Sequence, residues 1–278
     1  MLDFRYHALS LVAVFLALGI GIVLGATLGD SVVSQANRDV RSSLRGDLLD
    51  ALANARKAST QLTQRDRFET AAFPYIAGGR LRGSRVTIVS SGALPQDIEN
   101  SARNAVKDAG GTVDTTSQVD ARPDLGALGA VAGGGLPGTA PADVRPLGRR
   151  LGRALVRGGP LTQKLQDRFP DSFKGNYRPA DAVVFYRTAD ERDNPSKTLE
   201  SAMIEGMRAT GVPVVGVEQT DTDPSQIPYY VNAGLSTVDD VDIPPGRIAL
   251  VLTLTGRDGN FGFKQTAQAP LPPAPGGP

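Results

Sequence analysis

Residues 182–217 read AVVFYRTADERDNPSKTLESAMIEGMRATGVPVVGV. The stretch opens with a short apolar run at 182–187 and closes with a second at 212–217; both are rich in valine, which is typical of buried strands. Between them, apolar residues recur with helical spacing over about 196–210, and Gly211 follows as a helix stop signal. The stretch therefore predicts a strand, a helix and a second strand in succession.

The same succession occurs earlier in the chain, with a strand expected at 85–90, a helix at 95–109 and an extended segment at 112–119. Alternating strands and helices indicate an α/β domain with a mostly parallel, Rossmann-like sheet that is covered by helices. The remaining elements expected in the domain are a loop at 126–141, a helix at 142–157 and, in RIALVLTLT, a strand at 247–255.

An uncharged stretch at 8–28, ALSLVAVFLALGIGIVLGATL, precedes this domain. As a helix it would be roughly 31 Å long, which matches the hydrocarbon core of a bilayer. A cleaved signal peptide and a buried core helix are the alternatives, but the apolar run is longer than that of most signal peptides. We therefore expect an uncleaved transmembrane helix, with residues 1–29 forming the N-terminal tail and anchor.

Small residues recur every four positions along this anchor, which places them on one flank of the helix and allows another helix to approach closely. They are Ala13, Ala17, Gly21, Gly25 and Gly29. Small residues are common in membrane helices in any case, so the pattern favours helix pairing without requiring it.

Residues 30–73 lack proline and predict a helical stalk. Apolar residues in this segment alternate in steps of four and three, the period of a coiled-coil seam. They are Leu44, Leu48, Ala51, Ala55, Ala58 and Leu62. An unpaired amphipathic helix that packs on its own domain is the alternative.

The rest of the chain divides at three points. Pro74 is expected to end the helix. The α/β domain is expected to cover 80–263, and the Pro- and Gly-rich tail at 264–278 to be disordered.

The composition excludes several kinds of chemistry. The formal charge of +1 gives no overall field that would attract nucleic acid. The chain has no cysteine and one histidine, His7, so Cys-based zinc sites, Fe–S clusters and a Ser-His-Asp triad in the main domain are excluded. The absence of cysteine fits an envelope protein and a cytoplasmic one equally well.

Three carboxylates, Glu218, Asp221 and Asp223, precede a second acidic group at 239–242. Oxygen ligands of this kind suit Ca²⁺ or Mg²⁺, but the spacing is not that of an EF-hand, and solvated turns explain the same residues. We regard them as a candidate partner or ligand loop. A carboxylate pair that hydrolyses a wall glycan is the enzymatic alternative.

Two further features are candidates for binding. Met203 and Met207 lie four residues apart on an expected helix, so both thioethers could face a Cu(I) ion, and packing in the core is the alternative. Ser90-Ser91-Gly92 follows the first strand, where open α/β sheets bind ligands, and a plain connecting turn is the alternative.

Several separated segments resemble one known family. They are RYHALSLVAVFLALGIGIVLG at 5–25, PADAVVFYR at 179–187, VVGVEQTDTDPSQIPYYVNAGLSTVDDVD at 214–242, GRIALVLTL at 246–254 and GNFGFK at 259–264. The chain resembles the actinobacterial copper transporter family named for the mycobacterial protein MctB, which includes SteB-like envelope and cell-division proteins. The resemblance extends from the anchor through the stalk to Phe263.

The resemblance implies an envelope location with the main domain outside the cytoplasm, and a role in copper efflux or homeostasis. Arg38, Arg41 and Arg45 follow the span, and by local charge they favour a cytoplasmic main domain. The resemblance outweighs this weak orientation signal. In the SteB line it also implies partnership with the membrane protein SteA in septation and wall remodelling. The family brings no catalytic residues.

We therefore expect a non-enzymatic membrane protein that forms a homo-oligomer through its helix and stalk. We expect no cofactor, and copper is the one candidate for that role. A cell-division scaffold that acts with a SteA-like partner is the alternative.

Overall fold

The computed structural model describes the backbone of residues 4–273 and the side chains of residues 6–26 and 43–273. The chain divides into two units, Met1–Arg65 and Asp66–Pro278. Each unit is described by itself below.

The described residues of the first unit, 4–65, are helical, and the last residues of the same helix belong to the second unit. Helix α1 spans Phe4–Ile76. Its segment Tyr6–Ala26 is long and apolar enough to cross a membrane, and none of it is buried. An apolar N-terminal helix is thus confirmed. The predicted end at Pro74 was wrong, because the helix continues to Ile76 and the N–H of Ala77 still donates to the carbonyl of Phe73 at 2.8 Å. Proline has a helical φ and removes only one N–H, so a final turn can include it.

The second unit is built on a seven-stranded sheet with the order β3-β2-β1-β4-β5-β6-β7. Its strands are β1 (Arg85–Ser91), β2 (Thr112–Val119), β3 (Phe173–Gly175), β4 (Ala182–Arg187), β5 (Val214–Val217), β6 (Ser236–Val238) and β7 (Asn260–Phe261). All neighbours are parallel except the edge pair of β2 and β3. The mostly parallel sheet predicted from the sequence is therefore confirmed, and its order is that of doubly wound folds.

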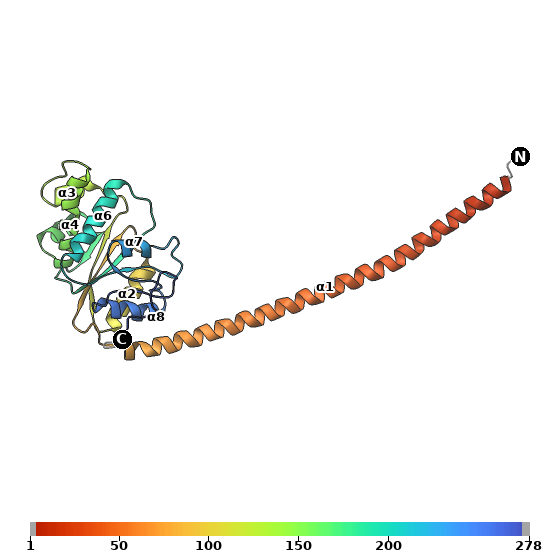
Figure 1. The fold of residues 1–278 in the computed structure, drawn as a ribbon, viewed down its shortest axis with the longest axis horizontal. Coiled ribbons are helices and arrows are strands. Elements are labelled where there is room, and N and C mark those ends of the chain that lie inside the picture. The colour runs from red at the N-terminus through yellow and green to blue at the C-terminus, as the bar shows by residue number, and fades with distance from the viewer. Residues whose placement is uncertain (1–3, 274–278) are drawn as a thin grey trace. The chain divides into compact units, whose positions relative to one another are not determined.

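Helices cover both faces of this sheet (Figure 1). α2 (Gln96–Asp108) and α8 (Pro244–Leu254) lie on one face, where Ile98 and Leu250 share an apolar cluster with Ile88 of β1. α4 (Pro141–Arg157) and α6 (Asn194–Arg208) lie on the other, where Leu151 and Met203 share a cluster with Phe185. The shorter helices are α3 (Leu125–Val131), α5 (Pro160–Arg168) and α7 (Ile227–Asn232).

α4 and α6 pack against each other at glycines. A Cβ on Gly152 would overlap the carbonyl oxygen of Met203, and one on Gly206 would overlap that of Arg149. The two backbones can approach this closely only because these positions have no side chain. This close contact holds α6, together with its polar side chains, in a fixed position against the sheet.

The predicted strand at 247–255 was wrong, because this segment belongs to α8. Every residue of α8 except Arg247 is buried. A helix that is apolar on all sides has no 3.6-residue period, so its sequence pattern does not differ from that of a buried strand. The pair Pro244-Pro245 in its first turn was the available helix signal.

Two predicted irregular segments also contain structure. The expected loop at 126–141 overlaps α3, whose N-terminus is capped by Asp124 through a 2.9 Å hydrogen bond from the N–H of Ala127. The tail predicted to be disordered is ordered as far as Pro273, since Phe261 bridges Ala269 and Leu271 packs against the core. Residues 274–278 of that tail lie outside the described residues.

Candidate functional site

The strand order creates a switch point between β1 and β4. The chain leaves β1 for α2 on one face and leaves β4 for α6 on the other. Ser91 and Arg187, the last residues of these strands, are register partners. Open α/β sheets bind ligands in the crevice outside such a point. The predicted Ser90-Ser91-Gly92 turn therefore lies where a ligand site is expected.

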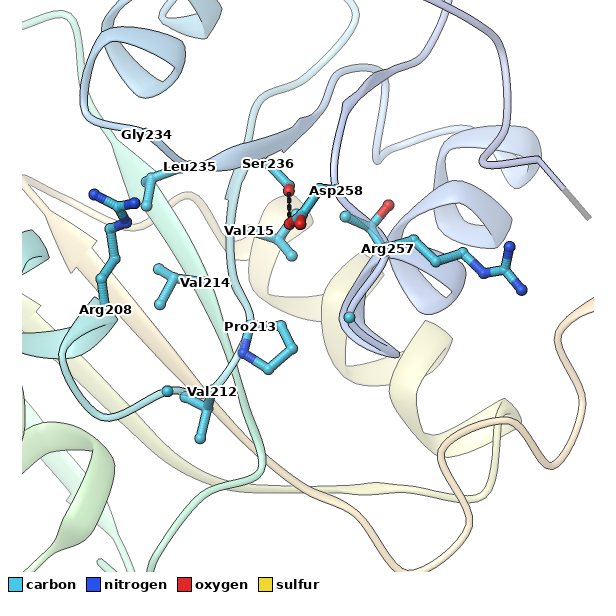
Figure 2. A pocket seen from close by; sticks show the side chains of 13 residues that line it. Arg208, Val212, Pro213, Val214, Val215, Gly234, Leu235, Ser236, Arg257 and Asp258 are labelled. Atoms are coloured by element: carbon cyan, nitrogen blue, oxygen red, sulfur yellow. Dashed lines mark hydrogen bonds between the residues drawn. The ribbon is translucent and has the colours of Figure 1, made fainter. Parts of the chain in front are cut away.

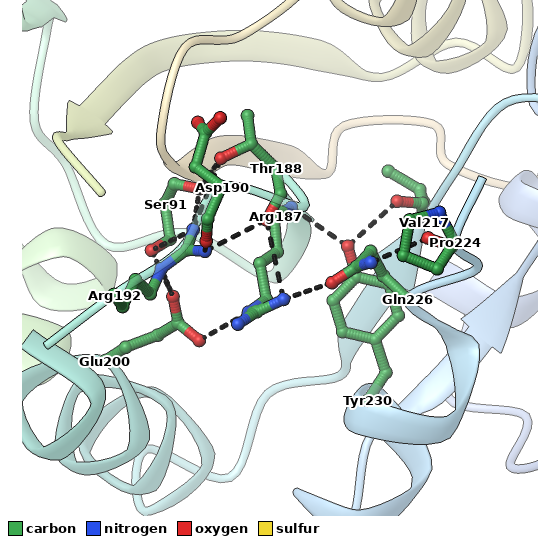
Figure 3. A network of polar contacts seen from close by, with 10 residues as sticks. All are labelled: Ser91, Arg187, Thr188, Asp190, Arg192, Glu200, Val217, Pro224, Gln226 and Tyr230. Atoms are coloured by element: carbon green, nitrogen blue, oxygen red, sulfur yellow. Dashed lines mark hydrogen bonds and ion pairs between the residues drawn. The ribbon is translucent and has the colours of Figure 1, made fainter. Parts of the chain in front are cut away.

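A buried carboxylate occupies this place (Figure 3). Glu200 of α6 is 3% exposed, and its Oε1 accepts from the Nε of Arg187 at 2.8 Å. Its Oε2 accepts a short hydrogen bond from the hydroxyl of Ser91 and lies 2.7 Å from the Nε of Arg192, whose N–H is not aligned for a hydrogen bond. One carboxylate thus links two arginines and the end of β1.

The rest of the Arg192 guanidinium is held by carbonyl oxygens of its own loop and of the end of β1. Nη2 donates to the carbonyl of Ser91 at 2.7 Å, and Nη1 donates to the carbonyls of Thr188 and Asp190 at 3.0 and 2.7 Å. Burial lowers the pKa of Arg192 from its ordinary value, and the charge of Glu200 opposes that shift. This arginine is therefore engaged on every side by its own chain.

Arg187 joins the network to α7. Its Nη1 donates to the side-chain oxygen of Gln226, and its guanidinium carbon lies 4.3 Å from the centre of the Tyr229 ring. Its backbone N–H donates to the hydroxyl of Tyr230 at 2.9 Å, and that hydroxyl donates to the carbonyl of Val217 at 3.1 Å. Side chains from three segments thus meet at the switch point (Figure 3).

A second buried polar cluster follows β5 and β6. Glu218 is fully buried, and its Oε1 accepts from the Nζ of Lys264 at 2.7 Å. Asp239, 1% exposed, accepts from the backbone N–H groups of Phe263 and Lys264 at 2.7 and 3.1 Å. Burial, followed by the neighbouring Asp240 carboxyl, raises the pKa of Asp239 to about 7. The cluster clamps the C-terminal segment onto the sheet.

The structure separates the three carboxylates of the candidate partner or ligand loop. Glu218 is buried and paired with Lys264, whereas Asp221 and Asp223 are exposed. Asp221 lines a polar groove of about 540 Å³ together with Asp97 and Asp242. The three thus differ in burial and in pairing, and a binding role for this loop stays a prediction.

A separate pocket of about 310 Å³ opens at the opposite edge of the sheet, at the amino ends of β5 and β6 (Figure 2). Arg208 and Arg257 line it, together with Val214, Leu235 and Asp258. Asp258 accepts from the hydroxyl of Ser236 at 3.2 Å, and Arg257 donates to the carbonyl of Pro273. These contacts tie two of its charged side chains to the chain itself.

Comparison with known proteins decides the family. A family model described as "Copper transport outer membrane protein, MctB" matches residues 1–272. The chain belongs to the MctB family. A relative named copper transporter MctB from Mycobacterium tuberculosis (strain ATCC 25618 / H37Rv) is 25% identical over 294 residues, covering 91% of this chain and 92% of the relative. A relative of the same name from Mycobacterium leprae (strain TN) is 24% identical over 313 residues, covering 94% and 96%.

These names concern copper transport, so they support that part of the prediction and give no support to the cell-division alternative. Within the described residues, no group of three or more His, Cys, Asp or Glu side chains is arranged to hold a metal ion. Met203 and Met207 are both fully buried in the apolar cluster beneath α4. Their role as copper ligands stays a prediction.

The predicted helix-pairing positions lie in the first unit. A Cβ on Gly21 or Gly25 would meet no atom within 4 Å in the single chain. The surroundings of Gly29 lie outside the described residues. Ala13 and Ala17 are exposed. All six predicted coiled-coil positions are exposed as well, with Leu44 at 62% and Leu62 at 58%. Pairing of either segment stays a prediction.

The sequence reasoning missed the network around Glu200. One signal was available: Glu200 precedes Met203 by three residues and Met207 by seven, so it lies on the apolar stripe of its helix. A carboxylate on a buried stripe indicates a paired charge, because an unpaired one costs several kcal/mol to bury. The sequence does not identify Arg187 and Arg192 as its partners.

Proposed function

We propose that this MctB family protein acts in copper export at the cell envelope, as a membrane-anchored and non-enzymatic component whose α/β domain lies outside the cytoplasm. The match of the family model to residues 1–272 carries this proposal. The unburied apolar segment Tyr6–Ala26 supports the anchor. The description of the family as a copper transport protein supports a non-enzymatic role.

We further propose that the domain contributes to copper export without holding copper at its methionines. Met203 and Met207 are fully buried and belong to the cluster that joins α6 to α4. A Cu(I) ion would reach the thioethers only if the closely packed α4 moved away from α6. Their contribution is then to the stability of the domain.

Deletion of the gene in its own organism is expected to raise cell-associated copper and to lower growth in added copper. Re-expression of the wild-type chain should restore both. The Met203→Leu plus Met207→Leu variant should restore them equally, because leucine replaces methionine in a core with little change of volume. The measurement is copper per cell by mass spectrometry, with growth recorded in parallel.

A normal copper content in the deletion strain would contradict the proposal. Elongated or branched cells with normal copper would favour the scaffold alternative. Loss of rescue in the double methionine variant, with the protein present at wild-type abundance, would instead make those thioethers copper ligands.

Self-association through the anchor and the stalk is also part of the proposal. Replacing Gly21 and Gly25 with leucine should lower the crosslinked dimer fraction in membranes severalfold, because the larger side chains keep two helices apart. Gly19→Leu is the matched control, since residue 19 lies on the opposite flank of the helix. Equal crosslinking in all three chains would remove the small-residue flank as an interface.

A further inference from the structure

The exposed face of α4 carries five arginines in one stripe. They are Arg145, Arg149, Arg150, Arg153 and Arg157, and all are exposed. At 100° per residue they fall within an arc of about 140° around the helix. The large apolar residues of α4, among them Leu147, Leu151 and Leu155, are buried on the other side. The helix therefore presents a continuous basic surface, here called the arginine stripe.

Few acidic groups neutralise the arginine stripe. Glu205 of α6 pairs with Arg145 and Arg149, at 2.8 Å in each case. Arg153 and Arg157 donate to the carbonyls of Arg149 and Thr210 at 3.3 and 2.6 Å, which satisfies hydrogen bonds but adds no negative charge. Five arginines against one glutamate leave a surplus of four positive charges. The one acidic residue of α4, Asp143, lies in its first turn at the edge of the arc and lines a pocket together with Arg150.

No large exposed apolar residue lies on the stripe itself. Between the arginines, the exposed apolar residues are Ala142 and Pro146, which line a pocket of about 320 Å³ next to Arg150. Interfaces with folded proteins usually have aromatic or large aliphatic anchors at a buried centre, and the stripe presents none. Guanidinium groups in an exposed row instead match phosphate oxygens, which they bind in pairs of hydrogen bonds.

We propose that the arginine stripe of α4 binds the anionic phospholipid headgroups of a membrane surface. The same chain carries a candidate membrane span at Tyr6–Ala26, so a lipid surface is present where the anchored chain acts. Clustered basic residues bind anionic bilayers additively, and α4, at roughly 25 Å, is long enough to contact several headgroups. The stripe would then set which face of the domain is turned toward lipid.

Co-flotation with vesicles tests this proposal on the full chain. The protein is held in nanodiscs of phosphatidylcholine and mixed with vesicles of phosphatidylcholine alone or of equal parts phosphatidylcholine and phosphatidylglycerol. Wild type should float with the anionic vesicles only, and high salt should release it because salt screens exposed charges. Arg150→Gln, Arg153→Gln and Arg157→Gln together should weaken binding on the order of 100-fold.

The matched control removes three exposed basic charges elsewhere on the domain, with Arg82, Lys107 and Lys174 each replaced by glutamine. Its affinity for anionic vesicles should stay within about twofold of that of wild type, since these residues lie outside the stripe. Equal weakening in both triple variants would overturn the proposal by showing a general charge effect. Failure of wild type to bind anionic vesicles, with stripe-dependent binding of polyglutamate, would overturn it in favour of an acidic protein partner.

Discussion

Replacing Glu200 with alanine is expected to destabilise the α/β unit by about 3–5 kcal/mol. Glu200 is 3% exposed and joins Arg187 and Arg192, whose side chains are 14% and 1% exposed. Without the carboxylate, two buried guanidinium groups repel each other with no charge between them, and Ser91 loses its acceptor. The loss is large because the surroundings cannot supply water in place of the missing oxygens.

The same helix offers a matched control. Glu205 also joins two arginines, but its side chain is 40% exposed, so Glu205→Ala should cost at most about 1 kcal/mol. Both variants are measured by urea unfolding of the full chain, followed by the near-ultraviolet circular dichroism of its packed tyrosines. The loss of stability in Glu200→Gln, which keeps an acceptor, should lie between the losses in the two alanine variants. Equal small losses for Glu200→Ala and Glu205→Ala would show that the network is not a buried ion cluster.

The second large effect is a loss of stability with rising pH that depends on Asp239. Its pKa of about 7 in the folded protein lies above the ordinary value of 3.8, so the folded state holds this proton more tightly than the unfolded state does. The resulting stabilisation is complete below about pH 4 and disappears as the pH rises through 7. Between pH 5 and pH 8 the stabilisation falls by about 3 kcal/mol.

Asp239→Asn should remove this component. An asparagine keeps an oxygen for the backbone N–H of Phe263, but its NH2 group cannot accept from the N–H of Lys264, so the variant is expected to be less stable at every pH while it loses the pH dependence. The measurement is the change in unfolding free energy between pH 5 and pH 8 in wild type and variant. Asp221→Asn is the control for losing an exposed carboxylate from the same edge of the sheet. The same pH dependence in wild type and Asp239→Asn would show that Asp239 is not the group responsible.

Local patterns predicted the elements with a clear period or a short apolar run. The strands at 182–187 and 112–119 and the helix at 142–157 were found within one or two residues of their ends. The helix and the strand at 112–119 each have one buried face, and the strand at 182–187 is a β-branched and aromatic run buried on both faces. α8 was taken for a strand because it is buried on all sides. β6 and β7, with three and two residues, are too short to produce a period.

The candidate site was predictable in position and not in composition. The end of β1 could be placed from its strand pattern, since ligand crevices follow from topology. The side chains that occupy the site could not be predicted. Glu200 accepts a hydrogen bond from Ser91, 109 residues away in the sequence, and Lys264 donates to Glu218, 46 residues away. Such pairs depend on the packing of α6 and of the C-terminal segment, which local periodicity does not encode.

The most direct test of the copper proposal separates the domain from the membrane. The deletion strain is complemented with the wild-type chain or with a chain carrying Leu16→Arg and Leu18→Arg, which place two charges in the apolar span. We expect wild type to remain with the membranes and to restore normal copper content, whereas the variant should leave the membranes and fail to restore it. A variant that is released from the membranes at wild-type abundance and still restores copper content would contradict the proposal.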